Sequence, residues 1–173
     1  MKESMAGTWI FGIVALFIVL FSSFIAYSIS YTKAFKVKNE ILNYIEQDEG
    51  FVKSSNVNDP AKMITDITDT STEAKAARLI DSMGYNSASV SCTGYGEEQY
   101  GGYCIAKICK NSEDGTSQTI NSQVVYKVTT FIKVNIPVVN INIKLPIKGE
   151  TKSLYYENVN SAATSCWEST KLN

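Results

Sequence analysis

The sequence contains no histidine among its 173 residues. Histidine is the commonest general base near neutral pH and a frequent metal ligand, so its absence removes the usual catalytic triads and histidine metal sites. A serine or cysteine nucleophile would lack its usual base partner. We therefore expect a protein that is not an enzyme and that requires no cofactor.

The sequence also lacks a surplus of positive charge. It has 16 lysines and arginines against 17 aspartates and glutamates, which gives a formal net charge of −1. A general nucleic-acid-binding protein needs a basic surface that neutralises phosphates. We expect no nucleic acid among the partners of this chain.

Charge is absent altogether from residues 8–29, TWIFGIVALFIVLFSSFIAYSI. A helix of these 22 residues would extend ~33 Å, which is enough to cross a hydrocarbon core of ~30 Å. The segment predicts a membrane anchor, with the lipid bilayer as a partner. The side chains that would form this anchor are large and apolar: Trp9, Ile10, Phe11, Ile13, Val14, Leu16, Phe17, Ile18, Val19, Leu20, Phe21, Phe24 and Ile25.

A cleaved signal peptide is the alternative for this segment, because residues 28–30 (SIS) form a small-x-small pattern. Against cleavage, no proline or glycine interrupts residues 13–49, and Gly50 is a suitable helix stop. We expect one helix of ~40 residues, apolar all round in its first half and amphipathic in its second. The apolar residues that recur at spacings of three and four are Tyr27, Tyr31, Ala34, Phe35, Ile41, Leu42 and Ile45.

The orientation of this anchor receives two opposing indications. Lys33, Lys36 and Lys38 follow the apolar segment, and the positive-inside rule would place that side in the cytoplasm. Cysteines beyond the same segment indicate an oxidising compartment. Because the rule is weaker for long translocated domains, we expect a single-pass protein of the cell membrane with an extracytoplasmic C-terminal domain.

Two short helices are predicted after the long one. Residues 51–59 form a connector, and Asp59 with Pro60 makes a good helix start for a segment that runs through Ile67. Residues 70–73, TSTE, form a capping box for a second helix that Gly84 ends.

Strands are predicted in the rest of the chain. Short strands at 87–92 and 104–109 flank a turn-rich loop at 94–103, and β-rich segments follow at 120–130 and 131–139, with Pro137 as an edge or break. Residues 140–148 alternate strictly, as a half-buried antiparallel strand does, and 151–157 form a last strand.

The fold class is therefore α+β. A long N-terminal transmembrane and amphipathic helix precedes a small antiparallel β-sheet domain with one or two packed helices and disulfides. We divide the chain into residues 1–50, the helix, and residues 51–173, the extracytoplasmic domain.

The four cysteines are Cys92, Cys104, Cys109 and Cys166. They lack the paired CxxC knuckles of a zinc site, so we expect no metal. An even number of cysteines beyond a membrane segment predicts two disulfides, for which three pairings exist. We favour Cys92–Cys104, which closes the loop at 94–103, and Cys109–Cys166, which ties the tail to the sheet.

The loop at residues 94–103 holds two glutamates and three tyrosines. The adjacent Glu97 and Glu98 point in different directions and do not form an acid–base pair. Two interpretations stay open: a disulfide-pinned surface loop, or a recognition or subunit-contact loop, since tyrosine is favoured at interfaces.

The layout of the chain resembles the pilin-like proteins of Gram-positive bacteria, in particular the TadE-like minor pseudopilins of tight-adherence pili. The resemblance rests on the apolar N-terminal helix, its extension YTKAFKVKNEILNYIEQ, the cysteine loop and the closing segment KVTTFIKVNIPVVNINIKLPIKGETKSLY. The layout also resembles a group of single-span proteins of Firmicutes. The resemblance implies a structural subunit of a surface pilus or secretion apparatus that assembles with other pilin-like subunits through the N-terminal helix.

A type IV pilin would be processed ahead of this helix and would carry a glutamate five residues into the mature chain. Gly7 and Thr8 are the candidate processing site, and Gly12 stands where the glutamate would be. In an assembly, the lysines after the span would meet Glu40, Glu46 or Glu49 of neighbouring subunits. The alternative is a single-pass, membrane-anchored extracytoplasmic domain that binds a ligand or partner without polymerising.

Overall fold

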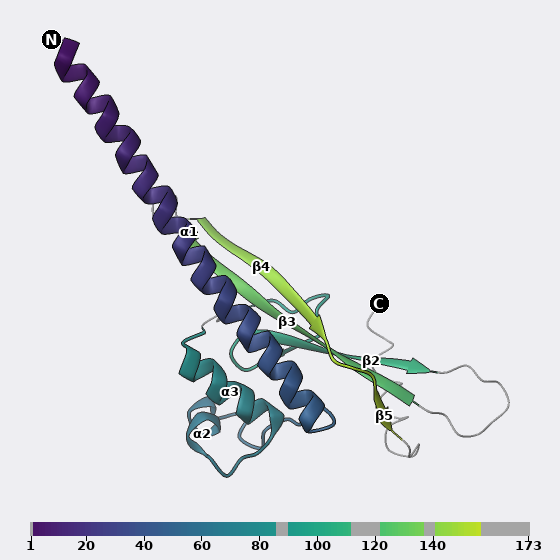
Figure 1. Cartoon of the computed structure of the whole chain (residues 1–173). Helices are drawn as coiled ribbons and strands as arrows, with labels where there is room; N and C mark the ends of the chain where they lie inside the picture. Colours follow the sequence, from purple (N-terminus) through teal and green to yellow (C-terminus); the bar gives the residue numbers. More distant parts are fainter. Residues whose placement is uncertain (1, 86–89, 112–121, 137–140, 157–173) are drawn as a thin grey trace.

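The structure of the chain, a computed structural model, describes residues 2–85, 90–111, 122–136 and 141–156. The fold is α+β, as the sequence predicts: a long N-terminal helix precedes two short helices and a small antiparallel sheet. Figure 1 shows the N-terminal half of the long helix projecting away from the other elements, while its C-terminal half lies along the sheet.

Helix α1 (Lys2–Gln47) is continuous over 46 residues and extends ~69 Å. This confirms the single long helix expected from the sequence. The helix ends where Glu49 adopts a left-handed φ of 53° and the N–H of Gly50 donates to the carbonyl of Ile45 at 2.9 Å. The left-handed residue is therefore Glu49, and Gly50 follows it as a buried residue.

The C-terminal half of α1 is part of the core of the domain. Its residues Ala34, Val37, Ile41 and Ile45 are fully buried and belong to one cluster with residues of the central strand. Those strand residues alternate along the chain and so share one face of the sheet: Val124, Tyr126, Val128 and Ile132. The helix and the sheet are thus one packed unit from about residue 34 onward.

Strand β3 (Ser122–Ile136) is the centre of the sheet. One edge pairs with β2 (Tyr103–Asn111), and the other pairs with β4 (Ile141–Glu150) and with β5 (Leu154–Tyr156). Strand β1 (Glu97–Gln99) pairs with β2 at the border of the sheet. All these pairings are antiparallel, as expected for β4 in particular.

Several sequence-based details differ in the structure. The two β-rich segments predicted at 120–130 and 131–139 contribute to one strand, because β2 pairs with the first part of β3 while β4 pairs with its second part. Residues 90–92 are not in a strand, and residues 86–89 and Pro137 lie outside the described ranges. The loop at 94–103 contains the short strand β1.

Helix α2 (Pro60–Thr65) is shorter than expected, and Ile67 beyond it is 83% exposed instead of packed. Asp59 caps its start, as predicted, by accepting from the N–H of Lys62 at 3.1 Å. Helix α3 (Thr72–Met83) ends at the left-handed Gly84, also as predicted.

The predicted capping box of α3 is wrong. Its N-cap is Ser71, whose hydroxyl accepts from the N–H of Ala74 at 3.3 Å. The carboxylate of Glu73 accepts from the backbone N–H of Ser54 at 2.9 Å and is therefore used elsewhere. This contact ties the connector after α1 to α3, which is why a charged side chain that is only 1% exposed is accommodated.

Candidate functional site

The apolar half of α1 is uncovered in the structure. Every large side chain assigned to the membrane anchor is exposed, with Trp9 at 74%, Phe11 at 75% and Phe24 at 67%. Among the described residues, one helix, Gly7–Gln47, is long and apolar enough to cross a membrane. Water is a poor solvent for such a surface, so the arrangement is compatible with a membrane anchor.

The hydroxyl groups within this apolar half bond to the helix itself. Ser22, Ser23 and Ser28 each donate to the carbonyl four residues earlier, at 2.8–3.0 Å. Thr32 does the same to the carbonyl of Ser28 at 2.9 Å. Since the polar hydrogens are satisfied internally, these residues can face hydrocarbon at little cost.

The candidate processing residues Gly7 and Thr8 lie within α1. A Cβ added to Gly7 or to Gly12 would meet nothing within 4 Å. The structure therefore has room for a larger side chain at Gly12, the position at which a type IV pilin would carry its glutamate.

A ladder of three aromatic rings marks the change from the exposed to the packed half of α1. Tyr27, Tyr31 and Phe35 follow one another at four-residue spacing, with ring centroids 6.4 and 6.1 Å apart. The Lys38 ammonium lies 4.4 Å from the centroid of the Phe35 ring, and Lys38 is only 8% exposed. Aromatic residues of this kind are enriched where a membrane helix leaves the bilayer.

The three lysines after the span have different surroundings. Lys38 is buried between Phe35 and the sheet, where its side chain lies against Gly149 of β4. It is not on the exposed face of α1, so the expected contact of Lys38 with a neighbouring subunit has no basis in this geometry. Lys33 and Lys36 instead line a surface hollow.

This hollow lies where α1 meets the end of α3. It has a volume of ≈ 390 Å³ and is lined by Ser28, Ile29, Thr32, Lys33, Lys36 and Met83. The sequence does not predict the hollow, because Met83 comes from a different helix. The recurrence of 28, 32 and 36, and of 29 and 33, at four-residue spacing indicates that these α1 residues lie near one another on the helix surface.

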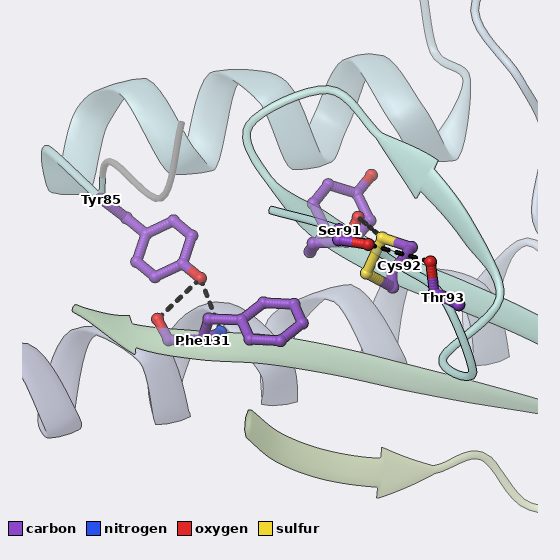
Figure 2. Close-up of a disulfide and its surroundings, with 7 residues drawn as sticks. Tyr85, Ser91, Cys92, Thr93 and Phe131 are labelled. Carbon is purple, nitrogen blue, oxygen red and sulfur yellow. Dashed lines mark hydrogen bonds between the residues drawn. A yellow bond between two sulfur atoms is a disulfide. The ribbon is translucent and has the colours of Figure 1, made fainter. Parts of the chain in front are cut away.

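The expected disulfide between Cys92 and Cys104 is present, with the two Cα atoms 5.7 Å apart. It lies on the face of the sheet opposite α1, in a small cluster with Val90 and Phe131. In Figure 2 the Phe131 ring lies between this disulfide and Tyr85. The Tyr85 hydroxyl donates to the carbonyl of Phe131 at 3.1 Å and accepts from its N–H at 2.9 Å. The side chain of Cys109 and all of Cys166 lie outside the described residues, so their predicted pairing stays a prediction.

The tyrosines of the loop at 94–103 pack inward. Tyr103 is fully buried, and Tyr95 lies edge-on against Phe131 with centroids 5.7 Å apart. Tyr100 packs on the cluster of Met63, Ala74 and Ala77. Of the two interpretations of this loop, the disulfide-pinned loop fits this packing better, because half-buried and buried rings offer little contact area to a partner.

The two glutamates of this loop are exposed, and Glu97 forms a surface ion pair with Lys53 at 3.0 Å. Burial raises the pKa of the Tyr103 phenol, and the nearby Glu73 raises it further. The Tyr103 hydroxyl is buried and forms no hydrogen bond with the residues that the structure describes.

The aspartates between α2 and α3 stabilise the turn that joins these helices. Asp69 accepts from the Ser54 hydroxyl and from the N–H of Ser71, and these bonds hold its pKa at about 2. Arg78 donates to the carbonyls of Asp66 and Asp69 at 2.7 and 2.8 Å. No group of three or more potential metal ligands occurs within the part of the chain that the structure describes.

The candidate site is a membrane-compatible helix with a structured boundary. Its elements are the exposed apolar half of α1, the aromatic ladder and the hollow beside it. Comparison of the chain with protein-family models, with curated proteins and with solved structures finds no significant match.

Proposed function

We propose that this chain is a membrane-anchored, pilin-like structural subunit of a surface pilus or secretion apparatus, with no catalytic role. In this proposal α1 crosses the cell membrane once, and the α+β domain lies on the extracytoplasmic side. The bilayer and the α1 helices of other pilin-like subunits are its partners.

The observation that carries the proposal is the division of one unbroken helix into two environments. The large apolar side chains of α1 from Trp9 to Ile29 are exposed, whereas Ala34, Val37, Ile41 and Ile45 are fully buried in the domain. A simple anchor needs no such rigid connection, and a flexible linker would serve it as well. A subunit that must fix its outer domain relative to a helical bundle benefits from a continuous helix.

Assembly would exchange lipid contacts for contacts between α1 helices. Because lipid tails are as apolar as the helix surface, packing and shape would drive this association. The exposed apolar surface of α1 runs on all sides of the helix from Trp9 to Ile29, so it offers several faces to neighbours.

An extracytoplasmic domain is supported by the disulfide between Cys92 and Cys104, since disulfides persist in oxidising compartments. The opposing argument from the lysines is weaker in the structure than in the sequence. Lys38 is buried against Phe35 and the sheet, which gives it a role in folding.

The second candidate is an anchored domain that binds a ligand or partner without polymerising. One observation favours it: Gly12 occupies the position of the glutamate that guides pilin docking, although α1 has open space there.

Site-specific photocrosslinking in the cells that make the protein separates the two candidates. A crosslinking amino acid replaces Phe17, which is 62% exposed in the apolar half of α1, and in a control variant it replaces Ile67, which is 83% exposed between α2 and α3. A pilin-like subunit gives a ladder of multiples of the 19.1 kDa chain from position 17 and none from position 67. Crosslinks to lipid alone, with monomer throughout, would support the non-polymerising anchor.

Two further measurements examine processing and orientation. Cleavage ahead of Thr8 gives a mature chain that begins at that residue in intact-mass analysis. In an Ile67→Cys variant, a membrane-impermeant thiol reagent applied to whole cells labels the introduced thiol, at a position that is 83% exposed, only if the domain is outside.

A further inference from the structure

We propose that the hollow between α1 and the end of α3 binds the phosphate headgroup of an anionic phospholipid in the leaflet next to the domain. This inference rests on the membrane-anchor part of the proposed function and does not depend on polymerisation.

The position of the hollow is the first argument. Ser28 and Ile29 are the last residues of the predicted span, residues 8–29, and they form one end of the hollow. Lys33 is four residues further along α1, or ~6 Å along the helix axis, which matches the few ångströms of headgroup region on each side of a bilayer. The lysines therefore lie at the depth of lipid phosphates when residues 8–29 span the membrane.

The chemistry of the lining is the second argument. Lys33 and Lys36 bring two positive charges, and none of the described residues that line the hollow carries a carboxylate. Ile29 and Met83 supply apolar surface in the same hollow. An anionic phospholipid presents this combination, with a negatively charged phosphate above apolar acyl chains.

The hydroxyl groups in the lining already donate to carbonyls of α1, so the lysines are the residues that would bind a phosphate. Ser28 donates to the carbonyl of Phe24 at 3.0 Å, and Thr32 donates to the carbonyl of Ser28 at 2.9 Å. The two ammonium groups are therefore the hydrogen-bond donors that this lining offers to a phosphate.

The end of α3 sets the place of one of these charges. A Cβ on Gly84, the left-handed cap of α3, would lie 3.7 Å from the Lys33 ammonium. The negative end of the α3 dipole therefore favours the charge of Lys33 at this place. Lys33 is thus positioned by the end of α3, whereas Lys36 is exposed on α1.

The proposal also accounts for the lysines that follow the span. Lys33 and Lys36 act as lipid ligands and Lys38 as a buried packing residue. Positive charge on this side of α1 is then compatible with an extracytoplasmic domain, because these lysines bind a lipid headgroup and do not only determine the orientation of the helix in the membrane.

Reconstitution of the full chain into nanodiscs tests the proposal. The discs contain either phosphatidylcholine alone or phosphatidylcholine mixed with phosphatidylglycerol, and native mass spectrometry of the released protein counts the lipids that stay bound. We expect selective retention of phosphatidylglycerol by the wild type. The double variant K33Q/K36Q should lower the affinity by about 25-fold, or about fivefold for each lysine.

The matched control is K62Q/K152Q, which removes the same charge from exposed positions in α2 and after β4. It should keep the wild-type preference. An equal loss in both double variants, or no preference for phosphatidylglycerol in the wild type, would overturn the headgroup site. Failure of the chain to enter nanodiscs of either composition would instead refute the membrane anchor, so the two failures are distinguishable.

A second arm separates a lipid from a free anion. The protein in neutral detergent is titrated with inorganic phosphate and, separately, with a short-chain phosphatidylglycerol, and thermal unfolding is recorded. Stabilisation by the lipid but not by phosphate is expected. The same stabilisation by both would contradict a lipid site and assign the hollow to small anions.

Discussion

The hydroxyl of Thr130 on β3 donates a 3.0 Å hydrogen bond to the carbonyl of Ala34 on α1, across 96 positions of sequence. Both residues are fully buried. Ala34 is also the first residue of α1 that is buried in the core, so this bond lies where the packing between the helix and the sheet begins. The rigid connection on which the proposed function depends begins at this contact.

Thr130→Val tests this contact. The substitution keeps the shape of the side chain and removes the hydroxyl, so we expect the free energy of unfolding to fall by about 1 kcal/mol. Chemical denaturation of the full chain in detergent micelles, followed by circular dichroism, measures the change. Thr129→Val is the matched control, because the buried Thr129 hydroxyl forms no hydrogen bond within the described part of the chain. The control should be neutral or stabilising, and equal losses in both variants would contradict a specific role for the Thr130 bond.

Gly96→Ala should destabilise the loop closed by the Cys92–Cys104 disulfide. Gly96 has a φ of 111°, and an added Cβ would lie 2.1 Å from the backbone oxygen of Ile105. Because the obstacle is backbone, it cannot move aside, and we expect a loss of more than about 3 kcal/mol, measured by thermal unfolding. Gly94→Ala shares the positive φ but meets open space, so it should cost only about 1 kcal/mol. A Gly96 variant as stable as the Gly94 variant would show that the loop does not approach β2 this closely.

Stability should fall in acid through Asp69. The hydrogen bonds from Ser54 and Ser71 lower its pKa to about 2, below the value of about 3.9 expected in the unfolded chain. The contribution of this carboxylate is therefore complete above pH ~4 and is lost as the pH falls toward the folded value. Asp69→Asn should be less stable than wild type at pH 6, and the difference should shrink as the pH is lowered to 2. Asp81→Asn, at an exposed position, is the control. A difference independent of pH would contradict the role of the Asp69 charge.

Stability should fall in alkali through Tyr103. Burial raises the pKa of this phenol in the folded state above the value of about 10 of the unfolded chain. Folding therefore favours the neutral phenol. Its contribution to the free energy of unfolding is complete below pH ~10 and is lost as the pH rises above that value. Tyr103→Phe should remove this part of the alkaline loss and should cost little at neutral pH, since none of the described residues hydrogen-bonds to this hydroxyl.

Tyr85→Phe provides the contrast to Tyr103. The Tyr85 hydroxyl makes two hydrogen bonds with the backbone of Phe131, at 3.1 and 2.9 Å, and the substitution leaves both backbone groups unpaired. We expect a loss of about 1–3 kcal/mol at neutral pH, measured by chemical denaturation. If Tyr85→Phe left the free energy of unfolding unchanged while Tyr103→Phe lowered it at neutral pH, the assignment of hydrogen-bond partners to these two phenols would be contradicted.

The sequence predicted the elements whose causes are local. The uncharged residues 8–29 and the apolar recurrence after them are enough to predict one long helix, and both are confirmed in α1. Asp59 with Pro60 and the glycine at position 84 predicted two helix ends correctly, because caps depend on neighbouring backbone groups. Strict alternation predicted β4, and loop closure favoured the Cys92–Cys104 pair.

Tertiary structure decided the features that depend on residues far apart in the chain. Glu73 looked like a capping residue, but the approach of the connector after α1 offered it the N–H of Ser54. Lys38 looked like a surface charge, but the docking of β4 buried it against Phe35. The hollow exists only because the end of α3 meets α1 beside the last residues of the span. The sequence by itself determined that α1 has an apolar half and an amphipathic half, since charge and periodicity are local; which side chains the domain covers was decided by packing.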